Sequence, residues 1–194
     1  GYAKTQPLDE YREQRRGGQG KAAASVKEED LIQNLYVLSS HVQILCFTTK
    51  GKVFWLKVYE IPVASRISKG RPLVNMLNLD DDESVSEILP VEEFTEDKFI
   101  FMATKKGTTK KTNLSLFAKK YKSGIKAINL DDDDVLIGTA ITSGNDEILL
   151  ASSSGKLIRF SESHVRPMGR TARGVRGITL KKDEKLISLM VGDE

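Results

Sequence analysis

The 194-residue sequence predicts an all-β fold made of about four similar units. Three landmarks recur along the chain in the same order, and the apolar stretches between them are short. These stretches are rich in Val, Ile and Phe and end at Gly, Asn, Asp or Ser, a pattern typical of strands. With 39% hydrophobic residues, the chain has enough apolar surface for a packed core, which argues against disorder.

The first landmark is an apolar run closed by a small-polar turn and a glycine. The glycine is Gly51, Gly107 or Gly155, and Gly1 stands in a partial first copy. Successive glycines are 50, 56 and 48 residues apart, which is the period of a propeller blade rather than of a helical repeat. Glycine favours a tight hairpin at each turn because it accepts positive φ.

The other two landmarks differ in charge. A basic, glycine-containing segment leads into an apolar strand at residues 15–21, 68–74, 123–128 and 173–178. An acidic turn precedes another apolar strand at residues 28–32, 80–85, 131–137 and 182–187. We expect the acidic runs to be solvated turns, because they lack the spacing of a calcium-binding loop.

The landmarks predict a single repeat domain, a fragment of a larger subunit, with blades at residues 1–50, 51–106, 107–154 and 155–194. An alternative division into two unrelated domains would need a linker, and none is visible. Single helical turns are expected at residues 7–14 and 114–122. The stretch 31–49 carries no charged residue, but its polar side chains exclude a membrane span.

No catalytic constellation emerges. The segment Gly17–Lys21 lacks the first glycine and the Ser or Thr of a phosphate-binding loop. His41 and His164 lie in different repeats without flanking carboxylates, so we expect solvated turn histidines, with a catalytic triad as the alternative. Cys46 is the single cysteine, which excludes disulfides and thiolate metal sites and favours a reducing compartment. We expect Cys46 and Trp55 in the core.

The net charge of +3 conceals two segregated populations of charge. Eight lysines and no acid lie between Lys105 and Lys126, and cations recur at the equivalent place in other repeats. On a propeller, such segments would form a positive belt around the rim, which suits the phosphates of duplex DNA. Only Tyr121 accompanies the lysines, which disfavours a stacking platform for single strands. A solubilising lysine surface is the alternative.

A specific motif lies at Gln14-Arg15-Arg16-Gly17-Gly18-Gln19-Gly20. It resembles the seven-residue box, Gln-(Arg/Lys)-Arg-Gly-Gly-(Arg/Lys)-Gly, of the C-terminal DNA-wrapping domain of the DNA gyrase A chain. The resemblance covers the whole chain and includes residues 2–8, 57–59, 70–72 and 174–177. Gln19 departs from the pattern, because the family usually has a cation there. The loss of one phosphate contact should soften wrapping without abolishing it.

The resemblance implies a β-pinwheel, a propeller-like disc of four-stranded blades, of which typical members have six. Such a disc wraps duplex DNA on its rim in a positive sense and supports negative supercoiling by a type IIA topoisomerase. No catalytic residue or metal is implied in this fragment. The nucleophilic tyrosine and the sites for Mg²⁺ and ATP belong to other domains. The implied partners are double-stranded DNA and the rest of the two gyrase subunits, GyrA and GyrB, in an A2B2 complex, in the bacterial cytoplasm at the nucleoid.

The predicted DNA-binding residues are those of the box and a set of cations along the repeats. They are Gln14, Arg15, Arg16, Gly17, Gly18, Gln19, Gly20, Lys21, Lys57, Lys69, Arg71, Lys110, Lys111, Lys119, Lys120, Lys122, Arg159, Arg166, Arg170, Arg173 and Arg176. Two alternatives stay open. One is the corresponding domain of topoisomerase IV, which usually has a degraded box. The other is a protein-binding propeller.

Overall fold

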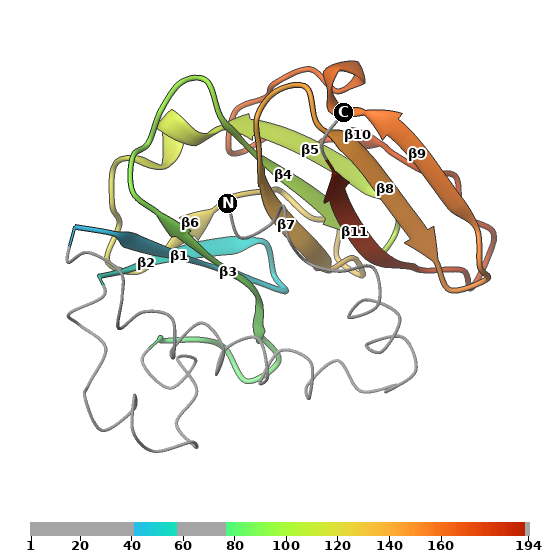
Figure 1. Cartoon of the computed structure of the whole chain (residues 1–194). Coiled ribbons are helices and arrows are strands. Elements are labelled where there is room, and N and C mark those ends of the chain that lie inside the picture. Colours follow the sequence, from blue (N-terminus) through green and yellow to red (C-terminus); the bar gives the residue numbers. More distant parts are fainter. Residues whose placement is uncertain (1–40, 58–76, 193–194) are drawn as a thin grey trace, which may run out of the picture.

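The computed structural model describes residues 41–57 and 77–192, which form three antiparallel sheets (Figure 1). Apart from strands, these segments contain only two 3₁₀ turns, so the all-β prediction is confirmed. One turn, η4 (Leu114–Phe117), falls where a single helical turn was expected, whereas the turn expected at 7–14 lies outside the described residues. Within the described segments, no helix is long and apolar enough to cross a membrane.

Eleven strands make up the described sheets. They are β1 (Gln43–Thr48), β2 (Lys52–Lys57), β3 (Val85–Val91), β4 (Phe99–Thr104), β5 (Thr108–Asn113), β6 (Ile125–Lys126), β7 (Leu136–Thr142), β8 (Glu147–Ser152), β9 (Leu157–Ser161), β10 (Val175–Arg176) and β11 (Leu186–Gly192). The strand order is β3-β1-β2-β6 in the first sheet, β10-β5-β4-β7 in the second and β11-β8-β9 in the third. Each sheet is therefore a hairpin whose first strand also pairs with a later strand.

Neighbouring repeats exchange a short strand. β6 lies between β5 and β7 in the chain, yet it pairs antiparallel with β2 of the preceding sheet, where Val53 faces Ile125. In the same way, β10 pairs with β5, where Thr109 faces Val175. Main-chain hydrogen bonds thus join each of these repeats to the one before it. Among the described residues, β9 has no equivalent outer partner.

The sheets divide the chain differently from the sequence landmarks. The expected boundaries at 50/51, 106/107 and 154/155 pass through the turns of the three hairpins, so each expected unit combines parts of two sheets. The chain passes from one sheet to the next between β3 and β4 and again between β7 and β8. A recurring pattern sets the period but leaves its phase open, because any landmark can serve as the start.

The hairpin glycines lie where neighbouring repeats touch. Gly107 has a φ of 94°, and its carbonyl accepts hydrogen bonds from the N–H groups of Gly177 at 2.8 Å and Ile178 at 3.3 Å. A Cβ at Gly107 would lie 2.7 Å from the carbonyl oxygen of Ile178. The same arrangement recurs at Gly51. Gly155 also has a positive φ, of 86°, but nothing lies within 4 Å of its Cβ position.

Gly107→Ala is expected to lower the free energy of unfolding clearly more than Gly155→Ala. Both variants place alanine at a positive φ, which costs about 1 kcal/mol. Only Gly107→Ala also drives a Cβ into the backbone of the next repeat, which should add roughly 1–3 kcal/mol. Urea denaturation of the two variants measures the difference, and equal losses would show that this contact between repeats is not tight.

Apolar side chains fill the spaces between the sheets. The cluster between the first and second sheets includes Phe47 and Ile100, and the cluster between the second and third includes Phe101 and Leu150. Cys46 is fully buried in a further cluster on the first sheet, as expected. Trp55 of β2 is partly buried against the first cluster.

The acidic turns are only partly solvated, contrary to the expectation. Their earlier aspartates are exposed, but the last acid of each run holds the neighbouring hairpin. The Thr48 hydroxyl donates to the buried Glu83 carboxylate at 2.6 Å. The Ser152 hydroxyl likewise donates to Glu184 at 3.0 Å, and Asp134 accepts from a turn N–H of the second hairpin at 2.9 Å. The first and third landmarks are therefore two halves of one turn structure.

The remaining candidates for catalysis or metal binding behave as expected where the structure describes them. His41 and His164 are exposed and lie in different repeats. Between residues 41–57 and 77–192, no group of three or more His, Cys, Asp or Glu side chains is placed to hold a metal ion.

Candidate nucleic-acid interface

The candidate cations lie on two connections that occupy the same place in successive repeats. The first connection, residues 118–124, runs from η4 to β6, and the second connection, residues 165–174, runs from η5 (Glu162–His164) to β10. Arg170 is half-buried. The cations that are exposed on these connections and on the short strands after them are Lys119, Lys120, Lys122, Lys126, Arg166, Arg173 and Arg176.

The second connection is fixed against the preceding repeat. The Met168 N–H donates to the Lys111 carbonyl at 2.7 Å, and Pro167 forms a parallel bridge with the same residue of β5. Further along, the Asn129 N–H donates to the Ala172 carbonyl at 3.3 Å. The arginines of the second connection therefore project from an anchored backbone.

Two lysines predicted to bind DNA are instead buried between repeats. Lys110 and Lys111 are 0% and 4% exposed. The Lys110 ammonium donates to the carbonyls of Ala127 at 2.7 Å and Arg170 at 2.5 Å, and that of Lys111 donates to the Glu162 carbonyl at 3.1 Å. The prediction of direct DNA contact is wrong for both, because β5 lies inside its sheet and the second connection covers it.

Burial, and to a lesser extent the positive charge of Arg170, lowers the pKa of Lys110 from 10.5 to about 8. The unfolded chain therefore keeps this proton to higher pH than the folded protein does. Stability should rise with pH between about 8 and 10.5, where the unfolded state binds more protons. We expect the difference in unfolding free energy between the wild type and Lys110→Met to grow across this window, measured by urea denaturation at several pH values. A difference independent of pH would contradict the assignment.

Glu162, a buried acid of η5, was not singled out by the sequence. Its carboxylate accepts hydrogen bonds from the Thr142 hydroxyl at 2.8 Å and the Asp146 N–H at 2.8 Å. The Lys111 ammonium lies 3.8 Å from the same carboxylate and 4.8 Å from the centroid of the Phe99 ring. Glu162 is the only acid between residues 156 and 176, and this isolation within a basic segment was the available signal.

Several other cations are paired with acids. Arg159 of β9 lies 3.1 Å from Glu147, and Arg173 lies 3.7 Å from Asp131. Lys57, at the end of β2, is half-buried. The cations of the hairpin turns pair with the acidic turns: hydrogen bonds to Asp82 and Asp80 raise the pKa of Lys50, and a hydrogen bond to Asp133 raises that of Lys106. Uncompensated positive charge is therefore concentrated on the two connections.

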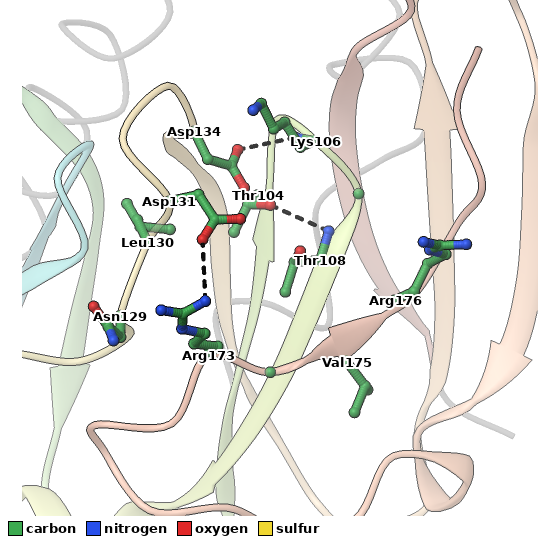
Figure 2. A pocket seen from close by; sticks show the side chains of 12 residues that line it. Thr104, Lys106, Thr108, Asn129, Leu130, Asp131, Asp134, Arg173, Val175 and Arg176 are labelled. Atoms are coloured by element: carbon green, nitrogen blue, oxygen red, sulfur yellow. Dashed lines mark hydrogen bonds and ion pairs between the residues drawn. The ribbon is translucent and has the colours of Figure 1, made fainter. Parts of the chain in front are cut away.

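A cleft of about 280 Å³ opens beside Arg173, between the second and third repeats (Figure 2). Its wall combines Lys106 and Arg176 with Asp131 and Asp134, and Figure 2 shows Arg173 turned toward Asp131. Walls of mixed charge suit neither a phosphate nor a cation. The cleft is a seam between repeats rather than a ligand pocket.

The box residues 14–21, together with Lys69 and Arg71, lie outside the described residues. Their predicted DNA-binding role stays a prediction. The structure brings the other candidates together only through the two connections, and it separates Lys57 and Arg159 from them as members of β2 and β9.

Comparison with known families agrees with the order of the sheets. A family model described as the DNA gyrase C-terminal domain, β-propeller, matches residues 1–39, 43–92, 98–143 and 146–193. The chain belongs to this family. The last three matched ranges contain the strands that start and complete the three sheets of the gyrase-family fold. The resemblance to gyrase seen in the sequence is thereby confirmed.

The relatives are the A-type subunits of DNA gyrase. That of Salmonella typhimurium is 53% identical over 98% of this chain, and that of Escherichia coli K12 is 52% identical over 98%. The chain spans 22% of the length of each. The crystal structure of the C-terminal domain of DNA topoisomerase IV matches with a TM-score of 0.74 and 28% identity, over 79% of this chain and 48% of that one. A structure of the DNA gyrase A C-terminal domain matches with a TM-score of 0.64 and 21% identity, over 79% and 49%. These likenesses confirm the β-pinwheel.

Proposed function

We propose that this gyrase-family domain binds duplex DNA along the two cationic connections and bends it around the disc. One observation carries the proposal: equivalent connections of successive repeats present exposed cations and no acid, since residues 105–126 and 163–182 contain neither Asp nor Glu. The acids of the same repeats hold the hairpin turns instead. Cations that recur along the protein suit phosphates that recur along the duplex.

Bending sets the number of contacts that the disc needs. Bending 20–30 base pairs by 40–90° costs roughly 1–6 kcal/mol. Several phosphate contacts from each repeat would offset this cost, and each of the two connections offers at least three cations. DNA held in this way would follow the curvature of the disc.

The domain would serve a larger enzyme. We infer an ATP-dependent type IIA topoisomerase of the gyrase type, in which this domain joins the rest of GyrA, together with GyrB, in an A2B2 complex acting on the bacterial chromosome. Nothing in this domain performs the cleavage, and Mg²⁺ and ATP would bind elsewhere in that complex. The wrapped DNA would be presented to the cleaving domains as a positive crossing, whose passage introduces negative supercoils.

The direct test is ligation of nicked circular DNA in the presence of increasing amounts of the protein. Wrapping should shift the linking number of the closed product in the positive sense. A protein-binding propeller predicts no shift at saturating protein, and that result would refute the proposal. In the holoenzyme, replacing Arg15, Arg16, Gly17 and Gly18 by alanine should abolish supercoiling and preserve relaxation. Unchanged supercoiling would count against the role of the box.

A second candidate is the corresponding domain of a topoisomerase IV. The observation in its favour is the TM-score of 0.74 to that structure, against 0.64 to the gyrase structure. The box at Gln14–Gly20, intact except for Gln19, and the 53% identity to a gyrase chain favour gyrase. A holoenzyme that relaxes DNA but never introduces negative supercoils would reverse this order.

A further inference from the structure

Side chains from three successive repeats meet around one tyrosine. Tyr121 of the first connection lies against Trp55 of β2, with ring centroids 5.9 Å apart and 49° between the ring planes. The Lys119 ammonium lies 5.4 Å from the centroid of the Tyr121 ring, and the guanidinium carbon of Arg170 also lies 5.4 Å from it. A single ring therefore holds two cations that belong to different repeats.

The backbone around this cluster is anchored on both sides. The Trp55 indole N–H donates to the Phe117 carbonyl at 2.9 Å, which fixes the start of the first connection. The buried Lys110 ammonium donates to the Arg170 carbonyl at 2.5 Å, which fixes the second connection. Because both backbones are held and both cations lie over one ring, the positive charges are positioned before a ligand arrives.

The charge of this cluster is not neutralised. Within residues 41–57 and 77–192, no ion pair reaches Lys119 or Arg170, whereas Arg173 pairs with Asp131 and Arg159 pairs with Glu147. The cluster lies where the two acid-free stretches, residues 105–126 and 163–182, come together. Two uncompensated cations on a shared aromatic support suit a small anion with several acceptor oxygens.

We propose that Lys119, Tyr121 and Arg170 form a phosphodiester-binding site at the junction between repeats, in which Tyr121 positions both cations. This site deepens the proposed DNA-bending function and rests on it. Preorganised side chains lose less conformational freedom on binding than free surface lysines do. One phosphate held here contacts two repeats at once, so DNA binding and the joining of these repeats are coupled at this point.

The test uses the 194-residue protein and a fluorescein-labelled 40-base-pair duplex, followed by polarisation at several salt concentrations. Arg170→Gln and Lys119→Gln should each weaken binding about tenfold, as for one lost charge-assisted contact. Each should also reduce the slope of log K against log salt by about 0.9. Lys182→Gln removes the same charge from an exposed residue of the third acidic turn and should leave both quantities near the wild type.

The role of Tyr121 needs a readout that loss of charge does not move. Tyr121→Phe keeps the ring and should bind as the wild type, whereas Tyr121→Leu should weaken binding about threefold. In the Tyr121→Leu background, Arg170→Gln should have a smaller effect than in the wild type, because the cation is no longer positioned. Fully additive effects would overturn the positioning role.

Trp55 reports on the same site, because it is the only tryptophan of the chain and contacts Tyr121. Saturating duplex should change the Trp55 emission of the wild type and change it less in Arg170→Gln. Salt-dependent binding that survives unaltered in Arg170→Gln and Lys119→Gln would overturn this site and leave the proposed function standing. The absence of salt-dependent binding in the wild type would instead overturn the proposed function itself.

Discussion

The affinity of the protein for duplex DNA is expected to fall about 10³- to 10⁵-fold when the salt concentration rises from 50 to 200 mM, as for about 6 to 10 phosphate contacts. The physical reason is the release of counterions from DNA when lysines and arginines neutralise its phosphates. Seven exposed cations on the two connections and the strands after them are available for these contacts, besides the half-buried Arg170. Polarisation of a labelled duplex across this range of salt gives the slope directly.

A pair of matched double variants separates this interface from general surface charge. Lys119→Gln with Lys122→Gln removes two charges from the first connection and should reduce the salt slope by about 1.8. Lys181→Gln with Lys182→Gln removes two exposed charges from the third acidic turn and should leave the slope unchanged. A complex that is insensitive to salt, or equal slopes in the two double variants, would contradict the interface.

Glu162→Ala is expected to lower the free energy of unfolding by about 3–5 kcal/mol, the range for breaking a buried ion pair. The substitution leaves the Thr142 hydroxyl and the Asp146 N–H without their acceptor and leaves the Lys111 ammonium buried without a counter-charge. These groups come from the second and third repeats, so the loss acts on the contact between them. Urea denaturation measures the effect.

The matched control is Glu147→Ala, which breaks a partly exposed pair with Arg159 in the same repeat. Exposed ion pairs contribute roughly 0–1 kcal/mol, so this variant should stay close to the wild type. Similar losses in Glu162→Ala and Glu147→Ala would mean that the buried pair does not hold the repeats together.

Much of the fold follows from local features of the sequence. Gly51, Gly107 and Gly155 identify the hairpin turns because each needs a positive φ, and their spacing identifies repeats of propeller size. The short runs rich in β-branched residues identify strands. The exposed cations of residues 119–126 and 166–176 could also be predicted, because lysine and arginine without nearby acids seldom lie in a core.

The phase of the repeats could not be predicted, because it depends on which strands pair. β6 and β10 leave their own repeats to extend the preceding sheets, and such pairing joins residues far apart in the chain. The acidic turns were misjudged for a related reason. Glu83 and Thr48 are 35 residues apart in the sequence, and no local pattern announces their contact.

The sequence by itself determined that this chain is all-β and repetitive, that its turns need glycine, and that its charges are segregated. Only the tertiary structure decided which cations face solvent. The strand Thr108–Asn113 is entirely polar, yet its central residues are buried, because it lies inside a sheet and the next repeat covers it. Lys110 and Lys111 point to opposite faces of that strand, as consecutive residues must. Each finds its acceptors only on backbone that another part of the fold supplies.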